Sequence, residues 1–173
     1  MLVYLLRHGI AADLGGSVRR DEDRPLTDEG RVKMKLQAKG MRRLELKFDY
    51  IFTSPYLRTR QTAEVVAAEF GMEKKLVEVA SLAAGRAFAH RWGNNADALV
   101  EVGAYSCESA LLVGHWPDVA ELASVLLTGE RNAAIDFKKG ALAAVEVAGL
   151  PPRSPGVLRW LLAPKQLQLI GKS

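Results

Sequence analysis

The chain opens with Leu2-Val3-Tyr4-Leu5-Leu6-Arg7-His8-Gly9, an apolar run that ends in two charged or ionisable residues. A continuous apolar run such as residues 2–6 is typical of a strand buried on both faces of a sheet. No basic segment precedes the run and no cleavage site follows it, so we interpret it as a first strand and not as a signal peptide. Arg7 and His8 are therefore expected at the end of a buried strand.

Working outward, further strands alternate with segments of helical periodicity. The expected strands cover residues 49–53, 76–80 and 109–114, and the expected helices cover about 28–46, 54–70 and 117–127. Thr27 is placed as the N-cap of the first helix, and Gly71 and Gly129 as the ends of the other two. The apolar face of the first helix is expected to hold Val32, Leu36, Leu44, Met34 and Met41. Residues 85–103 are interpreted as a loop that leads into a helix ending near Gly103.

The last third of the chain has a different pattern. Two apolar runs, 141–147 and 157–162, are joined by a segment rich in Gly and Pro, which predicts a hairpin at a sheet edge. Strands that alternate with helices predict an α/β fold. We therefore expect a three-layer α/β/α sandwich, with a mostly parallel sheet and an antiparallel hairpin at its C-terminal end.

Composition limits the function classes. A chain of 173 residues with 49% hydrophobic and 25% charged residues fits one globular domain, residues 1–173. The net charge of +4 is spread along the chain, which suits anionic ligands and gives no support for nucleic-acid binding. Cys107 has no second cysteine with which to form an internal disulfide or a metal cluster. No apolar run is long enough to cross a membrane, so we expect no membrane partner and a cytoplasmic location.

The chemistry is expected at the carboxyl ends of the strands, where open α/β sheets bind their ligands. The first strand ends in Arg7-His8-Gly9, the second leads into Ser54-Pro55-Tyr56-Leu57-Arg58-Thr59-Arg60-Gln61-Thr62-Ala63, and the strand at 109–114 leads into His115-Trp116-Pro117-Asp118. Arg58 is placed in the first turn of a helix, where the helix dipole disfavours a cation. A bound anion would relieve that repulsion. If the strands are neighbours, two imidazoles and two guanidiniums meet in one anion pocket.

These segments make the chain recognisable. Arg7-His8-Gly9, Ser54-Pro55-x-x-Arg58-Thr59-x-Gln61-Thr62-Ala63 and Gly114-His115 resemble the motifs of the histidine phosphatase superfamily, the phosphoglycerate mutase-like proteins. The short chain and the stretch Arg24-Pro25-Leu26-Thr27-x-x-Gly30 are similar to the small SixA-type phosphohistidine phosphatases. The resemblance covers residues 2 to about 127.

The resemblance implies a role for each matching residue. His8 would be the nucleophile that takes the phosphoryl group, and Arg7, Arg58 and His115 would bind its oxygens and stabilise the transition state. Arg24 would be a further phosphate or substrate contact, with a solvated side chain as the alternative. Phosphoryl transfer needs in-line attack and positive donors on the oxygens. The arginines supply these donors, so we expect no metal and no cofactor.

One expected group is missing. The mutase-like branch carries a glutamate as general acid after the second helix, but residues 81–95 contain no carboxylate here. The imidazole of phosphohistidine leaves as a weak base, so its cleavage depends less on an enzymatic acid. The nearest carboxylates, Asp13 and Asp118, could substitute, or could be solvated or helix-capping residues. The absence favours a phosphohistidine substrate.

The preferred hypothesis is a metal-independent phosphatase that acts on phosphohistidine of a partner protein. The alternatives are a phosphatase for a small sugar or nucleotide phosphate and a non-catalytic phosphate- or protein-binding module. His90 is interpreted as a surface-loop residue, with the pocket mouth as the alternative. Trp116 is expected either to wall the pocket or to pack in the core. Cys107 is interpreted as partly buried and inert.

Overall fold

The computed structural model describes residues 1–16, 18–87 and 97–172. Its strands are β1 (Leu2–Arg7), β2 (Tyr50–Thr53), β3 (Leu76–Glu78), β4 (Ser109–Gly114), β5 (Leu142–Glu146) and β6 (Val157–Leu162). Its α-helices are α1 (Asp28–Arg43), α2 (Leu57–Phe70), α3 (Asp97–Gly103), α4 (Asp118–Thr128) and α5 (Pro164–Lys172). Short 3-10 turns are η1 (Asp21–Asp23), η2 (Glu73–Lys75) and η3 (Ala80–Leu82).

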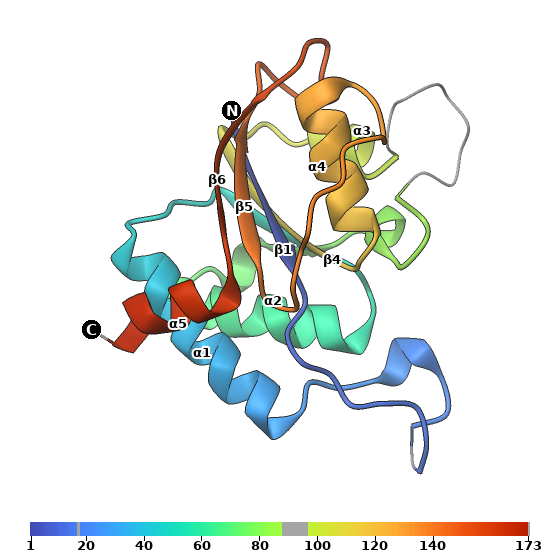
Figure 1. The fold of residues 1–173 in the computed structure, drawn as a ribbon, viewed down its shortest axis with the longest axis vertical. Helices are drawn as coiled ribbons and strands as arrows, with labels where there is room; N and C mark the ends of the chain where they lie inside the picture. The colour runs from blue at the N-terminus through green and yellow to red at the C-terminus, as the bar shows by residue number, and fades with distance from the viewer. Residues whose placement is uncertain (17, 88–96, 173) are drawn as a thin grey trace.

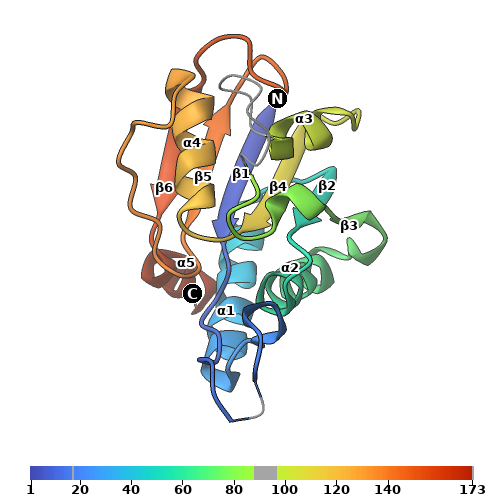
Figure 2. The same ribbon diagram turned by 90° about the vertical axis from the view of Figure 1, so that its right-hand side faces the viewer.

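The strands of the chain drawn in Figure 1 form one mixed sheet, and the strand order β3-β2-β4-β1-β5-β6 can be followed in Figure 2. The first four strands in this order are parallel. Strand β5 pairs antiparallel with β1, and β6 pairs antiparallel with β5 at the edge. The predicted parallel sheet with a C-terminal antiparallel hairpin is therefore confirmed.

Apolar side chains cover both faces of the sheet and divide the core into two clusters. One cluster joins alternate residues of the strands, such as Leu5, to α3 and α4. The other joins the opposite residues, such as Leu6, to α1, α2 and α5. Figure 2 shows α3 and α4 on the near side of the sheet, with α1 and α2 beyond it. The fold is the expected three-layer α/β/α sandwich, because each strand alternates its side chains between the two faces.

The first helix differs from its prediction in extent and in its buried face. It begins after Thr27, whose side chain accepts a hydrogen bond from Gly30 N at 3.0 Å as predicted, but it ends at Arg43 instead of residue 46. Met34 and Met41 are buried, whereas Val32 is 60% and Leu44 is 38% exposed. Val32 lies about 200° around the helix from Met34, since each residue turns it by about 100°. Val32 and Leu44 were therefore wrongly placed on the apolar face.

The second helix begins at Leu57, later than the predicted start at Ser54-Pro55. Ser54 lies outside the helix because its hydroxyl accepts hydrogen bonds from the structure around it, including Tyr56 N at 3.2 Å. Arg58 is still in the first turn, as predicted. Gly71 ends the helix in the left-handed region, with φ 66°, where glycine carries no Cβ penalty.

The C-terminal helix α5 was not predicted. It crosses α1 so closely that a Cβ on Gly40 would lie 2.2 Å from Leu167 O, and a Cβ on Gly171 would lie 1.9 Å from Leu36 O. These two glycines allow the helix backbones to touch. The contact closes the apolar cluster on that face of the sheet, where Leu167 is fully buried.

The parallel strands bring their carboxyl ends to one edge. Main-chain hydrogen bonds between neighbouring segments continue past the ends of the strands. His8 N donates to Gly114 O and Ser54 N donates to Val113 O, both at 3.1 Å. In Figure 2 the arrowheads of β1 and β4 point to this edge. The three motif-bearing segments are thus held together by main-chain hydrogen bonds.

Candidate active site

Strands β1, β2 and β4 are direct neighbours, so their ends bring together the predicted site residues. His8 is 6%, Arg58 is 4% and His115 is 2% exposed. The two imidazole ring centres lie 5.4 Å apart. The convergence of two imidazoles and a guanidinium is as the sequence predicted.

The ring of His8 is fixed by its own neighbour in the chain. Its Nδ1 lies 2.7 Å from Gly9 O, and because a carbonyl oxygen only accepts, Nδ1 carries the proton. In the neutral ring Nε2 is then unprotonated. Arg58 Nε donates to this Nε2 at 3.3 Å, which fits a lone pair there. Gly9 N donates to Thr62 Oγ1 at 3.1 Å, which anchors the turn to α2.

The ring of His115 has the opposite tautomer. Its Nδ1 lies 3.1 Å from Arg58 Nη2, and an arginine only donates, so Nδ1 is an acceptor. Its Nε2 lies 2.8 Å from Ser54 Oγ and carries the proton of the neutral ring. The edge of the Tyr56 ring packs against the imidazole, with ring centres 4.9 Å apart. Ser54 therefore fixes the orientation of His115, a contact that the sequence analysis did not assign.

The fourth predicted group, Arg7, is held by a different segment. Its Nη1 donates to Phe137 O at 2.6 Å, while its buried Nε has no hydrogen-bond partner. Its positive charge acts on the rings of both His8 and His115. The guanidiniums of Arg7 and Arg58 thus surround the two imidazoles with permanent positive charge.

Burial and these charges keep both rings neutral. Burial and the positive charges of Arg58, Arg7 and Lys139 together lower the pKa of His8 to about 3. Burial is the largest cause, and the hydrogen bond to Gly9 O opposes the shift only in part. The pKa of His115 is also lowered to about 3, first by burial and then by Arg58. At neutral pH the site combines uncharged imidazoles with charged guanidiniums, an arrangement that suits a tetrahedral oxyanion.

Arg24 lies in the long loop after β1, where its side chain is 19% exposed. Its Nη1 donates to Asp21 Oδ1 at 2.9 Å, and its Nε donates to Ala12 O at 2.5 Å. The alternative of a solvated side chain is therefore wrong. Asp21 also accepts from Arg58 Nη2 at 2.9 Å, so one carboxylate joins Arg24 to the pocket.

Asp21 was missed by the sequence analysis. It accepts a second bond from Arg58, in which Nη1 donates to Asp21 O at 2.5 Å. The only signal was the acidic run of residues 21–23 in a loop beside expected anion-binding arginines. Such a run is usually solvated. Asp21 and Arg58 are also 37 residues apart in the sequence, so no local pattern predicts their contact.

The two carboxylates considered as substitute acids are placed differently. Asp13 is 98% exposed in its side chain and lies 3.6 Å from Arg24 Nη2. Asp118 is buried at the start of α4, where its Oδ2 accepts from Gly85 N at 2.9 Å. Burial raises the pKa of Asp118, although hydrogen bonds from Gly85 and Ala87 oppose the shift. Asp118 thus holds the loop after η3.

The last predictions concern Trp116, Cys107 and His90. Trp116 is 57% exposed, so packing in the core is wrong. Cys107 is partly buried as predicted, and burial raises the pKa of its thiol. His90 lies outside the described residues, so its predicted place is untested.

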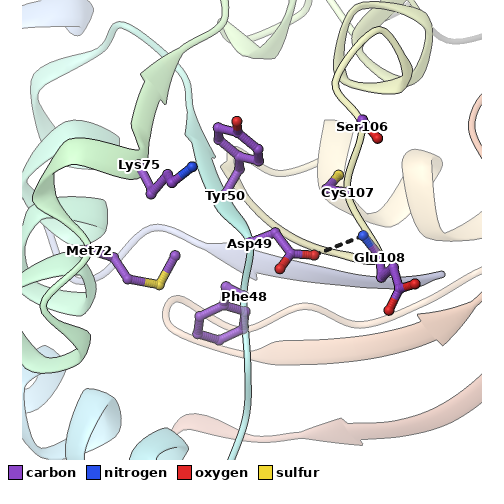
Figure 3. Close-up of a pocket in the computed structure, with 8 residues that line it drawn as sticks. All are labelled: Phe48, Asp49, Tyr50, Met72, Lys75, Ser106, Cys107 and Glu108. Carbon is purple, nitrogen blue, oxygen red and sulfur yellow. Dashed lines mark hydrogen bonds between the residues drawn. The ribbon is translucent and has the colours of Figure 1, made fainter.

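Another hollow, of about 590 Å³, lies at the amino ends of β2 and β4 (Figure 3). One of its two carboxylates, that of Asp49, accepts hydrogen bonds from Glu108 N at 2.8 Å and Ser109 N at 2.9 Å. Lys75 Nζ lies 4.6 Å from the centre of the Tyr50 ring. These polar groups join segments of the fold to one another, and the hollow contains none of the predicted site residues.

No three His, Cys, Asp or Glu side chains within residues 1–16, 18–87 and 97–172 are grouped so that they could hold a metal ion. No helix in the same ranges is long and apolar enough to cross a membrane.

The chain is similar in sequence and fold to known proteins. The model of the histidine phosphatase superfamily (branch 1) matches residues 3–82. An uncharacterized protein of Picosynechococcus sp. is 36% identical over 174 residues, covering 96% of this chain and 99% of that protein. Phosphohistidine phosphatase SixA of Escherichia coli is 28% identical over 173 residues, 98% of both chains. A structure of the protein histidine phosphatase SixA with tungstate superimposes with a TM-score of 0.76 at 26% identity, covering 96% of this chain and 99% of that one.

The fold and these likenesses define a phosphatase. The chain belongs to the histidine phosphatase superfamily and is of the SixA type within it. The tungstate in the similar structure is a tetrahedral oxyanion.

Proposed function

We propose that this protein is a metal-independent phosphatase that removes the phosphoryl group from phosphohistidine on a partner protein, through a covalent intermediate on His8. The observation that carries the proposal is the tautomer of His8. With Nδ1 bound to Gly9 O, the lone pair of Nε2 lies in the pocket beside Arg58. A neutral, oriented imidazole is the nucleophile that such a transfer requires.

In the first step the Nε2 lone pair of His8 forms a bond to phosphorus. The bond between phosphorus and the leaving group breaks, and its electron pair goes to the leaving group. Arg7, Arg58 and His115 bind the phosphoryl oxygens, whose negative charge must be stabilised during transfer. In the second step water attacks phosphorus, the bond to His8 breaks, its electron pair returns to Nε2 and phosphate is released.

The carboxylates of the site support a phosphohistidine substrate over a phosphate ester. An alkoxide leaving group needs a proton from a general acid. Asp13 is exposed and Asp118 is bonded to the loop after η3, so neither is held as such an acid in the pocket. An imidazole leaving group has less need of one. The resemblance to phosphohistidine phosphatase SixA favours the same substrate class.

The proposal is tested by turnover of a phosphohistidine peptide and p-nitrophenyl phosphate, each with EDTA present. The peptide should be cleaved much faster, and His8→Ala should abolish both activities while its thermal unfolding stays cooperative. Quenching the wild type in alkali, where the P–N bond is stable, should trap a phosphoryl group on His8. Equal or faster cleavage of the aryl ester would favour a small-molecule phosphatase. Binding of phosphate without turnover of either compound would favour a binding module.

A further inference from the structure

The turn η1 is attached to the pocket through its first residue, Asp21. Arg58 Nη1 donates to Asp21 O at 2.5 Å, and Arg58 Nη2 donates to Asp21 Oδ2 at 2.9 Å. The same guanidinium lies 3.3 Å from His8 Nε2 and 3.1 Å from His115 Nδ1. One guanidinium therefore separates the Asp21 carboxylate from both imidazoles.

The Asp21 carboxylate lies between the buried Arg58 guanidinium and solvent. The Arg58 side chain is 5% exposed, whereas that of Asp21 is 42% exposed. An ionised carboxylate has about four acceptor positions. Arg58 takes one and Arg24, at 2.9 Å from Oδ1, takes another. Asp21 therefore keeps acceptor capacity on its exposed side.

The charge state of Asp21 decides which chemistry it can perform. Partial burial acts to raise its pKa, but the hydrogen bonds and charges of Arg24 and Arg58 outweigh it, and the pKa is lowered. At neutral pH the group is a carboxylate. It accepts hydrogen bonds and attracts positive charge, and it has no proton to give.

We propose that Asp21 is a specificity-determining residue that accepts a hydrogen bond from the protonated imidazole ring of a phosphohistidine substrate. This inference rests on the proposed function. A phosphohistidine ring carries phosphorus on one nitrogen, and the other nitrogen can bind a proton. When that proton is present, the electron pair of the breaking P–N bond goes to the ring, which leaves as neutral imidazole. Without it the ring would have to leave as an anion.

A carboxylate beside the ring favours this reactive form, because a nearby negative charge raises the pKa of a base. It also replaces the missing general acid, since the proton arrives with the substrate. A phosphate ester gains nothing from the same group. Its leaving oxygen carries no proton and becomes negative as the P–O bond breaks, so Asp21 repels it. The negative charge of Asp21 thus favours phosphoramidate substrates and disfavours phosphate esters.

The test compares Asp21→Asn with Asp23→Asn on two substrates, a phosphohistidine peptide and p-nitrophenyl phosphate. Asp23 is the matched control because it lies in the same turn and forms an ion pair with Arg20, away from the pocket. In Asp21→Asn, kcat/KM for the peptide should fall about 10- to 100-fold, the effect of losing one charge-assisted hydrogen bond. The value for the aryl ester should rise. Asp23→Asn should change neither.

The ratio of the two kcat/KM values separates this role from a structural one. If Asp21 only held Arg58 in place, both activities would fall together and the ratio would stay constant, which would overturn the inference. Asp21→Ser provides a second variant and should shift the ratio in the same direction. A wild-type protein inactive on the peptide would overturn the proposed function itself. An active wild type with an unchanged ratio in both variants would overturn only the role of Asp21.

Discussion

Lowering the pH is expected to destabilise the fold through the two pocket histidines. In the folded protein the pKa of His8 and that of His115 are each about 3, compared with about 6.5 in an unfolded chain. Between these values the unfolded state binds more protons, so stability is complete above about pH 6.5 and falls as the pH decreases toward 3. Each ring contributes a slope of about 1.4 kcal/mol per pH unit. From pH 6.5 to 5.0 this gives about 2 kcal/mol for each histidine, or about 4 kcal/mol for both.

The assay is urea unfolding at several pH values from 8 to 5, for the wild type and for His115→Asn. Carboxylates that titrate in this range contribute to both proteins, so the difference between their slopes isolates the ring. The variant should lose about 1.4 kcal/mol less per pH unit below pH 6.5. NMR of the imidazole protons gives a direct check, because His8 and His115 should not titrate between pH 8 and 5. Parallel slopes together with an inflection near pH 6.5 would refute the argument from burial and arginine charge.

Three further perturbations probe the pocket and the helix contact. Ser54→Ala should cost about 1–3 kcal/mol in urea unfolding, because it leaves the Nε2 proton of His115 buried without an acceptor; an unchanged stability would mean that water replaces the hydroxyl. Gly40→Ala should lower the free energy of unfolding by about 1–3 kcal/mol, since its Cβ would lie 2.2 Å from a backbone oxygen of α5. Gly149→Ala is the control and should lower it far less, because the space around Gly149 is open. Equal unfolding midpoints for these two variants would contradict the close helix contact. Arg58→Lys should weaken tungstate binding in calorimetry about tenfold or more, because a lysine lacks the planar fork that reaches several oxygens, and unaltered binding would place the oxyanion elsewhere.

Most of the fold was predictable because its signals are local. Apolar runs such as residues 109–114 are short, continuous and bounded by turn residues, so the strand was predicted with its observed limits. Helix α5 was not predicted, since it has only nine residues and is held by the close approach of Gly40 and Gly171. That contact joins segments far apart in the chain. The error at Val32 has a related cause, because an apolar residue on a helix does not itself show which side faces the core.

The site residues also divide into those that local sequence signals predict and those that depend on contacts between distant segments. Arg7, His8, Arg58 and His115 lie next to strand ends, and parallel strands necessarily bring those ends together. Asp21 begins the short 3-10 turn η1 within the long connection from β1 to α1, so its position depends on the path of the chain between these two elements. The arginine-rich edge was thus visible in the sequence, whereas the carboxylate that modifies it was visible only in the structure.

The neutral state of the rings also constrains how a phosphoryl group can enter the proposed mechanism. In the structure His115 Nδ1 accepts a hydrogen bond from Arg58, so it cannot at the same time donate to a phosphoryl oxygen. An incoming oxyanion must take over the Arg58 donor, and its negative charge raises the pKa of His115 by opposing the effects of burial and of Arg58. A His115 that gains a proton in this way would become a donor to the phosphoryl oxygen. In the proposed mechanism His8 would avoid the same change, because its Nε2 lone pair, which accepts from Arg58 Nε in the free protein, would be directed at phosphorus and not at an oxygen. Under this proposal two rings with similar pKa values in the free protein would take different roles once the substrate is bound, His115 as a donor to a phosphoryl oxygen and His8 as the nucleophile.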